Sequence, residues 1–427
     1  NGVNPGSFQA AGDNENPRIG QYSISNSVSR NEVLEAYANY NKDFGIHNLD
    51  VMAGYSWQHV YNGGQSISYF NETDEVKLNP GESIDTRYPY GASESYLVSF
   101  YSRVNYSLDS RYLFTASIRA DGSSKFSPAT RWGIFPSGAF AWNIAEEGFL
   151  EDASSLSQLK LRLSAGMTGQ QDGISDYAHL ARYKLSDDVY SVYNMGNYGY
   201  QFVYTPQAYD PNIKWETTTT YNAGIDFGFF KDRLTGSVDA YLRNTNDLLN
   251  VVTTPMGSNF GNSLLTNIGS LQNKGIEFAV NVIPVQTEDW HLSVGFNGTF
   301  QDTKFTKLNA TDDPNYYEEV TLISKGTGSK LSRHQVGYAP YSYYVLQQIY
   351  DHEGNPIQNA FVDQNKDGVI NDLDKYCAGD PNPDFYFGLN LKLSYKNWDF
   401  GFNGHGSIGY TVFNDFASAN STAYINT

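Results

Sequence analysis

Residues 290–301 read WHLSVGFNGTFQ, and this stretch decides the fold. Apolar residues stand at every second position with polar residues between them: Trp290, Leu292, Val294 and Phe296 alternate with His291, Ser293 and Asn297. Successive side chains of a β-strand point to opposite faces, so the pattern predicts a strand with one apolar and one polar face.

The same period of two recurs along most of the chain and indicates about twelve strands and no convincing helix. The other segments with this pattern are Leu34–Tyr40, Leu49–Trp57, Tyr96–Tyr106, Tyr112–Ala120, Ile134–Trp142, Leu159–Met167, Tyr221–Phe229, Leu234–Arg243, Ile276–Val282, Phe385–Ser394 and Trp398–Tyr410. Many of them are long enough for a tilted strand to cross a bilayer, which takes about 9–11 residues. Their apolar faces begin or end in aromatic residues, as expected where lipid meets water.

The connections between these strands are of two kinds. Short turns are predicted at Asn41–Gly45, Asp109–Arg111, Lys231–Arg233, Gln286–Asp289 and Lys396–Asn397, and intermediate connections at Asp121–Arg131 and Ile144–Ser157. Long connections are predicted at Val60–Glu94, Gly169–Trp215, Asn250–Leu271 and Asn309–Asp384. Short turns at one end and long loops at the other are typical of an antiparallel transmembrane β-barrel of the outer membrane, with the long loops outside the cell.

This barrel prediction has consequences for the two faces of the sheet. Six apolar residues are expected to face lipid: Leu234, Val238, Leu292, Val294, Leu389 and Leu391. A soluble β-sandwich or propeller is the alternative, but the sequence has no clear blade-length repeat that would support a propeller.

Composition narrows the functional classes. The chain has 28 Lys and Arg against 46 Asp and Glu, a formal charge of −18, so binding to nucleic acid is not expected. Cys377 is the single cysteine, which excludes an intrachain disulfide framework. No framed nucleophile or paired His metal site stands out, so we do not expect an enzyme.

Several sequence blocks resemble one family. They are RWGIFPS at 131–137 with AWNIAEE at 141–147, LKLR at 159–162, DPNIKWETT at 210–218, DFG at 226–228 with RLTG at 233–236, NKGIE at 273–277, and GDPNPDF at 379–385. In this order they resemble the SusC/RagA family of TonB-dependent outer-membrane transporters of Bacteroidetes. The resemblance covers nearly the whole chain.

The resemblance implies a barrel of about 22 strands, closed by an N-terminal plug. It implies TonB-dependent import of a nutrient, a glycan oligosaccharide or a peptide, together with a SusD-like surface lipoprotein that acts as a lid. Neither plug nor TonB box is recognisable, so we expect residues 1–427 to be one middle-to-late portion of such a barrel, with the last strands also absent from this chain. Two alternatives stay open: a surface-binding or scaffold barrel that does not transport, and a soluble β-rich carbohydrate-binding or hydrolytic protein.

Residues 363–374, DQNKDGVINDLD, have the spacing of a calcium-binding loop. The predicted ligands at positions 1, 3, 5, 7 and 12 are Asp363, Asn365, Asp367, the carbonyl of Val369, and Asp374. Gly368 would permit the sharp turn, and we expect any calcium here to be structural. The alternative is a polar turn ordered by bonds from its side chains to its own backbone.

The long connections are rich in aromatic residues that suit sugar faces or peptide chains. One group is Tyr183, Tyr190, Tyr193, Tyr198, Tyr200, Phe202 and Tyr204, and the other is Tyr316, Tyr317, Tyr338, Tyr341, Tyr343, Tyr344 and Tyr350. They are predicted either to contact a ligand, or to pack loop against loop or against a partner protein.

Overall fold

The main sheet has twelve antiparallel strands that follow one another in chain order. The computed structural model describes residues 20–71, 91–185, 192–194, 200–202, 204–253, 263–309, 313, 316–322 and 330–415. The strands are β1 (Gly20–Phe44), β2 (His47–Asn71), β3 (Gly91–Leu108), β4 (Tyr112–Ser123), β5 (Trp132–Asn143), β6 (Leu156–Gln170), β11 (Glu216–Phe229), β12 (Leu234–Thr253), β13 (Ser263–Gln286), β14 (Trp290–Lys307), β21 (Phe385–Tyr395) and β22 (Trp398–Ile408). The strand count and the antiparallel meander agree with the sequence-based prediction.

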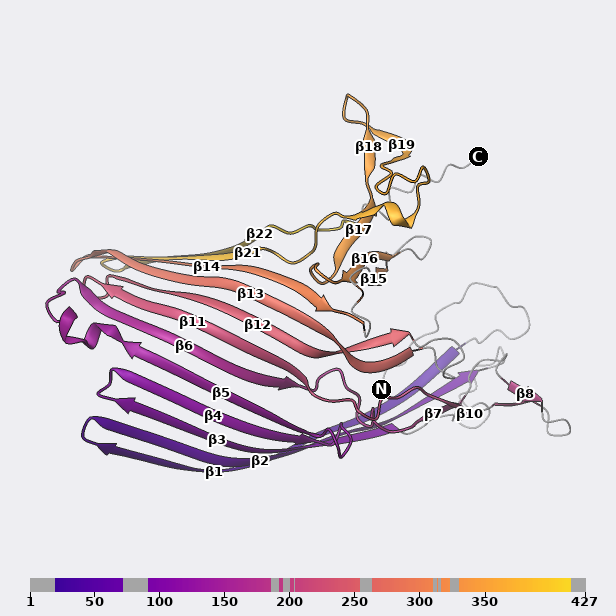
Figure 1. Cartoon of the computed structure of the whole chain (residues 1–427), viewed down its shortest axis with the longest axis horizontal. Helices are drawn as coiled ribbons and strands as arrows, with labels where there is room; N and C mark the ends of the chain where they lie inside the picture. Colours follow the sequence, from indigo (N-terminus) through magenta and orange to yellow (C-terminus); the bar gives the residue numbers. More distant parts are fainter. Residues whose placement is uncertain are drawn as a thin grey trace.

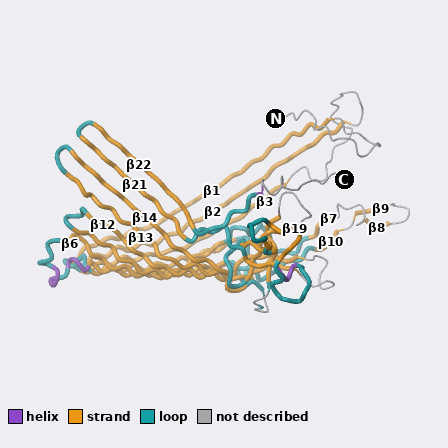
Figure 2. The backbone as a smooth tube through the Cα atoms, turned by 90° about the horizontal axis from the view of Figure 1, so that it is seen from above, coloured by secondary structure: helices purple, strands orange, loops and turns teal. Residues whose placement is uncertain are grey.

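The sheet is a curved wall with different connections at its two ends. The hairpin turns lie together at the left of Figure 1, and the long connections lie together at the right. Figure 2 shows that β1 and β2 rise at one side of the sheet and β21 and β22 at the other, so the wall is bent like a trough. The predicted asymmetry between short turns and long connections is therefore confirmed.

Smaller sheets lie within the two longest connections. The connection from β6 to β11 contains β7 (Tyr183–Leu185) paired with β10 (Tyr204–Pro206), and β8 (Val192–Asn194) paired with β9 (Tyr200–Phe202). The connection from β14 to β21 contains a sheet of β15 (Tyr317–Leu322), β16 (Lys330–Gln335), β17 (Ser342–Leu346) and β20 (Lys375–Cys377), and the pair β18 (Gln348–Tyr350) and β19 (Pro356–Phe361).

Helical structure in the described residues includes three short 3-10 turns. These are η1 (Ile144–Glu146), η2 (Gly148–Leu150) and η4 (Asp372–Asp374). No helix in the described part of the chain is long and apolar enough to cross a membrane.

Strand register places the apolar residues of neighbouring strands on one face. Residues paired directly across an antiparallel ladder share a face. One such row runs Leu234, Val282, Val294 and Leu391 across β12, β13, β14 and β21. Another runs Val51, Val104 and Ala116 across β2, β3 and β4. By alternation the six residues predicted to face lipid all lie on this apolar face.

Charged and aromatic residues mark the limits of the apolar band. Along β2 the band runs from Leu49 to Trp57, a length that suits the crossing of a bilayer by a tilted strand. The next side chain on this face is His59, which contacts the carboxylates of Glu32 and Glu94 at 3.0 and 3.2 Å. These polar groups place the end of the band just beyond Trp57.

Aromatic pairs border the band at the hairpin end. The rings of Trp290 and Tyr395 lie 4.1 Å apart between centroids. Tyr112 and Trp142 both donate hydrogen bonds to Glu147, at 2.6 and 2.9 Å. Aromatic rings with polar atoms directed at the turns are typical of the lipid–water boundary, so the predicted aromatic strand ends are confirmed.

Most strands extend beyond their predicted limits, and four of them do so by ten or more residues. β1 begins at Gly20 rather than Leu34, β2 ends at Asn71 rather than Trp57, β12 ends at Thr253 rather than Arg243, and β13 begins at Ser263 rather than Ile276. The predicted loops Val60–Glu94 and Asn250–Leu271 are therefore too long. Beyond the apolar band both faces of a strand meet water, so the period-two signal fades although the backbone pairing continues.

Candidate functional site

The predicted calcium loop lies between β19 and β20, at the end of the wall that carries the long connections. The Asp363 carboxylate accepts hydrogen bonds from the backbone N–H groups of Lys366, Asp367 and Gly368, at 2.6, 3.2 and 2.8 Å. Gly368 has φ +83°, the left-handed conformation that favours glycine, so the sharp turn predicted there is present.

The last residue of the loop, Asp374, is fully buried. Its carboxylate accepts hydrogen bonds from the backbone N–H groups of Asn371, Gln364 and Asn365, at 2.8, 2.9 and 3.4 Å. These bonds, that from Asn371 most of all, lower the pKa of Asp374 below its ordinary value. Asp374 therefore closes the loop by joining its first and last turns.

The loop retains oxygen lone pairs that a cation could use. Each carboxylate oxygen can accept two hydrogen bonds, and Asp367 accepts one on each oxygen, from Asn365 and Val369. The Val369 carbonyl accepts a long bond of 3.4 Å from Asn371. However, the described residues bring together no group of three or more His, Cys, Asp or Glu side chains that could hold a metal ion. Both readings of the loop are compatible with these bonds, and calcium stays a prediction.

The tyrosines of the long connections divide into packing and exposed residues. Arg333 is 7% exposed, and its guanidinium carbon lies 4.0 and 4.5 Å from the ring centroids of Tyr317 and Tyr344. Burial raises the pKa of Tyr344. In contrast, Tyr183 and Tyr204 are 67% and 68% exposed. Tyr190 and Tyr198 lie outside the described residues.

An apolar cluster lies at the long-connection end of the wall. Its buried members are Phe126, Phe135, Ile174, Ala178, Ile213 and Trp215. The Trp215 ring lies 4.9 Å from Phe126 and 5.5 Å from Phe135, and its indole N–H donates to the carbonyl of Arg131 at 2.9 Å. The cluster ties together three segments that are up to about ninety positions apart in the sequence.

This cluster also fills a gap between strands. β5 pairs with β6 only from Ser137 to Asn143. Above that point the Phe135 ring lies so close to Gly169 that a Cβ there would be 2.1 Å from it. Phe135 and Trp215 belong to the blocks that carried the family resemblance, and Phe126 lies just before the first of them. The sequence blocks therefore pointed to Phe135 and Trp215, but they did not show that these two side chains are in contact.

The polar face of the sheet carries an ion triad that sequence analysis missed. The Arg162 guanidinium on β6 binds both oxygens of Asp226 on β11 at 2.8 Å and one oxygen of Asp239 on β12 at 2.8 Å. Gly224 lies between them, and a Cβ there would be 2.2 Å from an Asp239 oxygen. Alternation alone identifies these residues as polar-facing, whereas only strand register shows that they meet.

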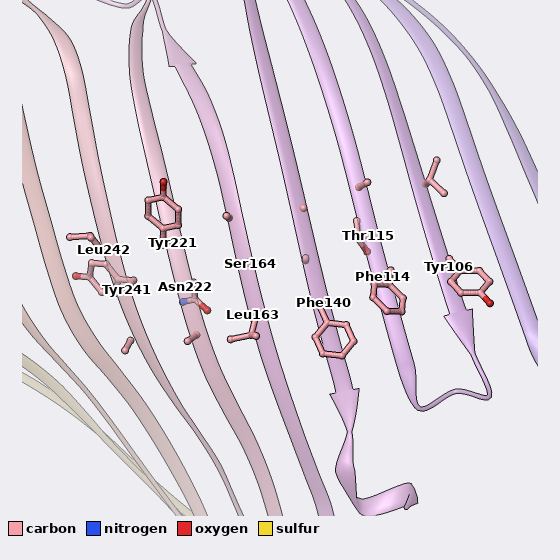
Figure 3. A pocket seen from close by; sticks show the side chains of 17 residues that line it. Tyr106, Phe114, Thr115, Phe140, Leu163, Ser164, Tyr221, Asn222, Tyr241 and Leu242 are labelled. Carbon is pink, nitrogen blue, oxygen red and sulfur yellow. The ribbon is translucent and has the colours of Figure 1, made fainter.

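The apolar face contains a shallow hollow instead of charged groups. Its volume is about 830 Å³, and it crosses β3, β4, β5, β6, β11 and β12. Figure 3 shows Phe114, Phe140 and Leu163 beside it on successive strands. Small residues form its floor, among them Ala116, Gly138, Ala165, Ala223 and Ala240. No charged side chain is among the residues that line this hollow, and an apolar surface of this kind suits contact with lipid chains.

Comparison with known proteins agrees with this geometry. The family model for "TonB dependent receptor-like, beta-barrel" matches residues 2–424. The chain is 44% identical over 388 residues to the TonB-dependent receptor SusC of Bacteroides thetaiotaomicron, with 90% of the chain and 38% of that receptor covered. It is 34% identical to the TonB-dependent receptor P3 of Formosa agariphila, with 92% of the chain and 41% of that receptor covered.

Among solved structures, the RagAB peptide importer in its "open-open" state has a TM-score of 0.73 with 24% sequence identity, covering 92% of this chain and 42% of that one. This likeness concerns the fold alone. The chain thus spans about two-fifths of the length of the proteins it matches. It belongs to the TonB-dependent receptor-like β-barrel family of the outer membrane, and the predicted resemblance to SusC and RagA is confirmed.

Proposed function

We propose that this chain forms part of the wall of an outer-membrane importer that takes up a nutrient in a TonB-dependent way. The observation that carries the proposal is the division of one sheet into an apolar face and a polar face, with every long connection at one end. The apolar face suits lipid, the polar face suits a wet interior, and the long connections suit capture outside the cell.

A SusD-like lipoprotein is the proposed partner, and a glycan oligosaccharide or a peptide the proposed cargo. The partner is supported by 44% identity to SusC. A peptide cargo is supported by the fold shared with a peptide importer, and a glycan by the exposed tyrosines of the long connections. Rings such as Tyr183, Tyr204 and Tyr350 can cover a partner or a ligand at low entropic cost.

The proposal requires no catalytic residue, because TonB-driven movement of a plug would provide the direction of transport. The test compares uptake of the natural nutrient in cells that have or lack TonB, with the complete transporter and lid expressed in both. An importer loses uptake without TonB but still binds nutrient at the cell surface. Unchanged uptake without TonB would instead favour a surface-binding barrel.

We also propose a structural calcium ion in the loop 363–374, held by Asp363, Asn365, Asp367, Asp374 and the Val369 carbonyl. The remaining lone pairs of these oxygens support it, and extracellular loops of this kind bind calcium at about 10⁻⁴–10⁻³ M. Calorimetric titration of the purified complete protein should show this binding, and Asp367→Ala should abolish it.

Asp372→Ala is the matched control for that titration. Asp372 lies in the same loop, is 79% exposed and pairs with Lys375 at 2.9 Å, outside the predicted ligand positions. Equal calcium binding by both variants, or none by the unmodified protein, would leave the loop as a self-ordered polar turn.

A further inference from the structure

A second hollow opens on the polar face of the wall, at the long-connection end. Its volume is about 670 Å³. Gln58 and Asn62 of β2 and Ser93 and Ser95 of β3 form one side, and the segment 171–182 that follows β6 forms the other. Gln58 points away from the apolar face because it alternates with Trp57, and by strand register Asn62, Ser93 and Ser95 share its face and lie nearer the mouth. The hollow therefore lies where a solute entering the barrel would first meet the inner wall.

The segment 171–182 is held firmly over this hollow. Ile174 and Ala178 are 3% and 7% exposed because they are members of the apolar cluster. The Lys125 ammonium donates to the Ile174 carbonyl at 3.1 Å. The Tyr177 hydroxyl accepts a hydrogen bond from the backbone N–H of Glu94 at 3.2 Å, which joins the segment to β3. The hollow is thus a preformed feature with ordered walls on both sides.

Tyr177 has a strained backbone conformation. Its φ is +79°, which is unfavourable for a bulky residue. Residues held in such conformations cluster at binding sites, where the strain positions a side chain. Here the strained residue lines the hollow, and Tyr177 as a whole is 40% exposed. The fold therefore places an accessible aromatic residue at the wall of the hollow.

The polar groups around the hollow are mostly neutral hydrogen-bonding groups. Besides the side chains of β2 and β3, Ser123 and Ser175 line it. Gln171 lines it as well. Hydroxyl and amide side chains both donate and accept hydrogen bonds, so they suit a ligand with many hydroxyl groups.

Charges at the hollow balance. Lys125 and Arg182 are opposed by Asp172 and Asp176, and Lys125 lies 3.9 Å from Asp176. The site therefore has no net charge that would attract a ligand of one sign, and many of its lining groups are hydroxyls and amides. Hydroxyl groups of a sugar both donate and accept, so they match this lining better than a chain with charged side groups.

We propose that this hollow, named here the mouth pocket, binds a neutral oligosaccharide segment, with the face of one sugar ring on Tyr177. The proposal rests on the proposed import function and chooses between its two cargo classes. The mouth pocket is then the first sugar-binding position on the barrel wall.

The test measures ligand binding by the complete transporter with its lid, using native mass spectrometry. Two probes are used: a mixture of neutral oligosaccharides of four to eight hexose units and a mixture of uncharged and charged decapeptides. Ser175→Trp places a bulky ring in the mouth pocket, and Ser154→Trp, also exposed but at the hairpin end, is its matched control. Gln58→Ala removes one hydrogen-bonding group, and Gln158→Ala is its control at the opposite end of the same face.

Binding of oligosaccharides by the unmodified protein is expected to be at least about tenfold weaker in Ser175→Trp and measurably weaker in Gln58→Ala, with both controls unchanged. Melting temperatures of the four variants establish that they are folded. If Ser175→Trp does not fold, Gln58→Ala still tests the mouth pocket.

Three outcomes would overturn the proposal. Oligosaccharide binding that survives both pocket variants would place the sugar elsewhere, and binding of peptides in place of oligosaccharides would give the pocket the other cargo. Both leave TonB-dependent import intact. The third outcome is that the unmodified protein binds neither probe, which also overturns the mouth-pocket proposal. The import function itself would be rejected only if uptake continued unchanged in cells without TonB.

Discussion

At the scale of single residues, Gly224 shows how a missing side chain organises the polar face. The Arg162 guanidinium must pass over β11 to reach Asp239 on β12, and it does so over the backbone of Gly224. Any Cβ at that position would stand where the Asp239 carboxylate now lies, 2.2 Å away. The glycine is therefore required by the close approach of two charged groups.

Gly224→Ala should destabilise the barrel by separating Arg162 from Asp239. We expect a loss of about 1–2 kcal/mol, less than for fully buried groups because the Arg162 side chain is 33% exposed. Urea unfolding of the complete protein in lipid vesicles measures it. Gly401→Ala is the control, since nothing lies within 4 Å of a Cβ there. Equal losses in both variants would mean that the triad adds nothing.

Asp374 makes the order of its loop depend on pH. Its pKa is lowered from an ordinary 3.8, so its hydrogen bonds stabilise the fold above that value and are lost as pH falls through the lowered pKa. The hydrogen-exchange protection of residues 363–374, corrected for the pH dependence of intrinsic amide exchange, should therefore fall below about pH 3.8 in a calcium-free sample.

Asp374→Asn should remove this pH step and leave exchange fast at neutral pH, whereas Asp372→Asn should preserve the step. Corrected protection that does not change with acid in the unmodified protein would show that Asp374 does not close the loop.

At the scale of strands, lipid and water decide which substitutions are tolerated. Val294 lies in the apolar row between Val282 and Leu391. Asn297 lies on the opposite face, beside a hollow of about 390 Å³ that can receive a longer side chain. Two nearby positions on one strand thus have opposite surroundings.

Val294→Arg should cost roughly 2–4 kcal/mol of folding free energy in vesicles if the position lies near the bilayer midplane, and Asn297→Arg much less. The measurement is reversible unfolding of the complete barrel with each substitution. Comparable costs at the two positions would contradict the assignment of the apolar face to lipid.

Strands within the apolar band could be predicted from sequence, and their extensions could not. In β14 the residues from Trp290 to Phe296 alternate because one face of the strand meets lipid and the other meets water. In β1 the stretch from Gly20 to Val33 alternates only in part, because the polar residues Asn26, Arg30 and Glu32 occupy positions on the face that is apolar within the band. Backbone pairing holds that extension, and backbone pairing leaves little trace in composition.

At the scale of the whole molecule, the end that carries the long connections was predictable but its packing was not. The strands of an antiparallel meander alternate in direction, so the connections that follow β2, β6, β12 and β14 must lie at the same end regardless of their sequences. The contact of Trp215 with Phe126 joins positions 89 apart and requires the register of four strands. The mouth pocket and the Arg162 triad escape sequence analysis for the same reason.

The long connection between β14 and β21 forms a small sheet of its own with exposed aromatic rings. β15, β16, β17 and β20 form a separate small sheet above the wall, stabilised by Arg333 between Tyr317 and Tyr344. Ordering a connection of this length is unfavourable unless it packs or binds, and its exposed rings leave area for binding. If the proposed lid binds the complete transporter, we expect this sheet to be among its contacts.

The most direct test of the import proposal is deletion of residues 316–350 from the complete transporter, replaced by a short Gly/Ser linker, with lid co-purification and growth on the natural nutrient measured together. A Glu353→Ala variant serves as the control, since it keeps the connection and changes a side chain that is 70% exposed and lies outside the small sheet. We predict that the deletion abolishes lid association and growth while the barrel still folds in the outer membrane. Lid association and growth that both continue unchanged would contradict the account.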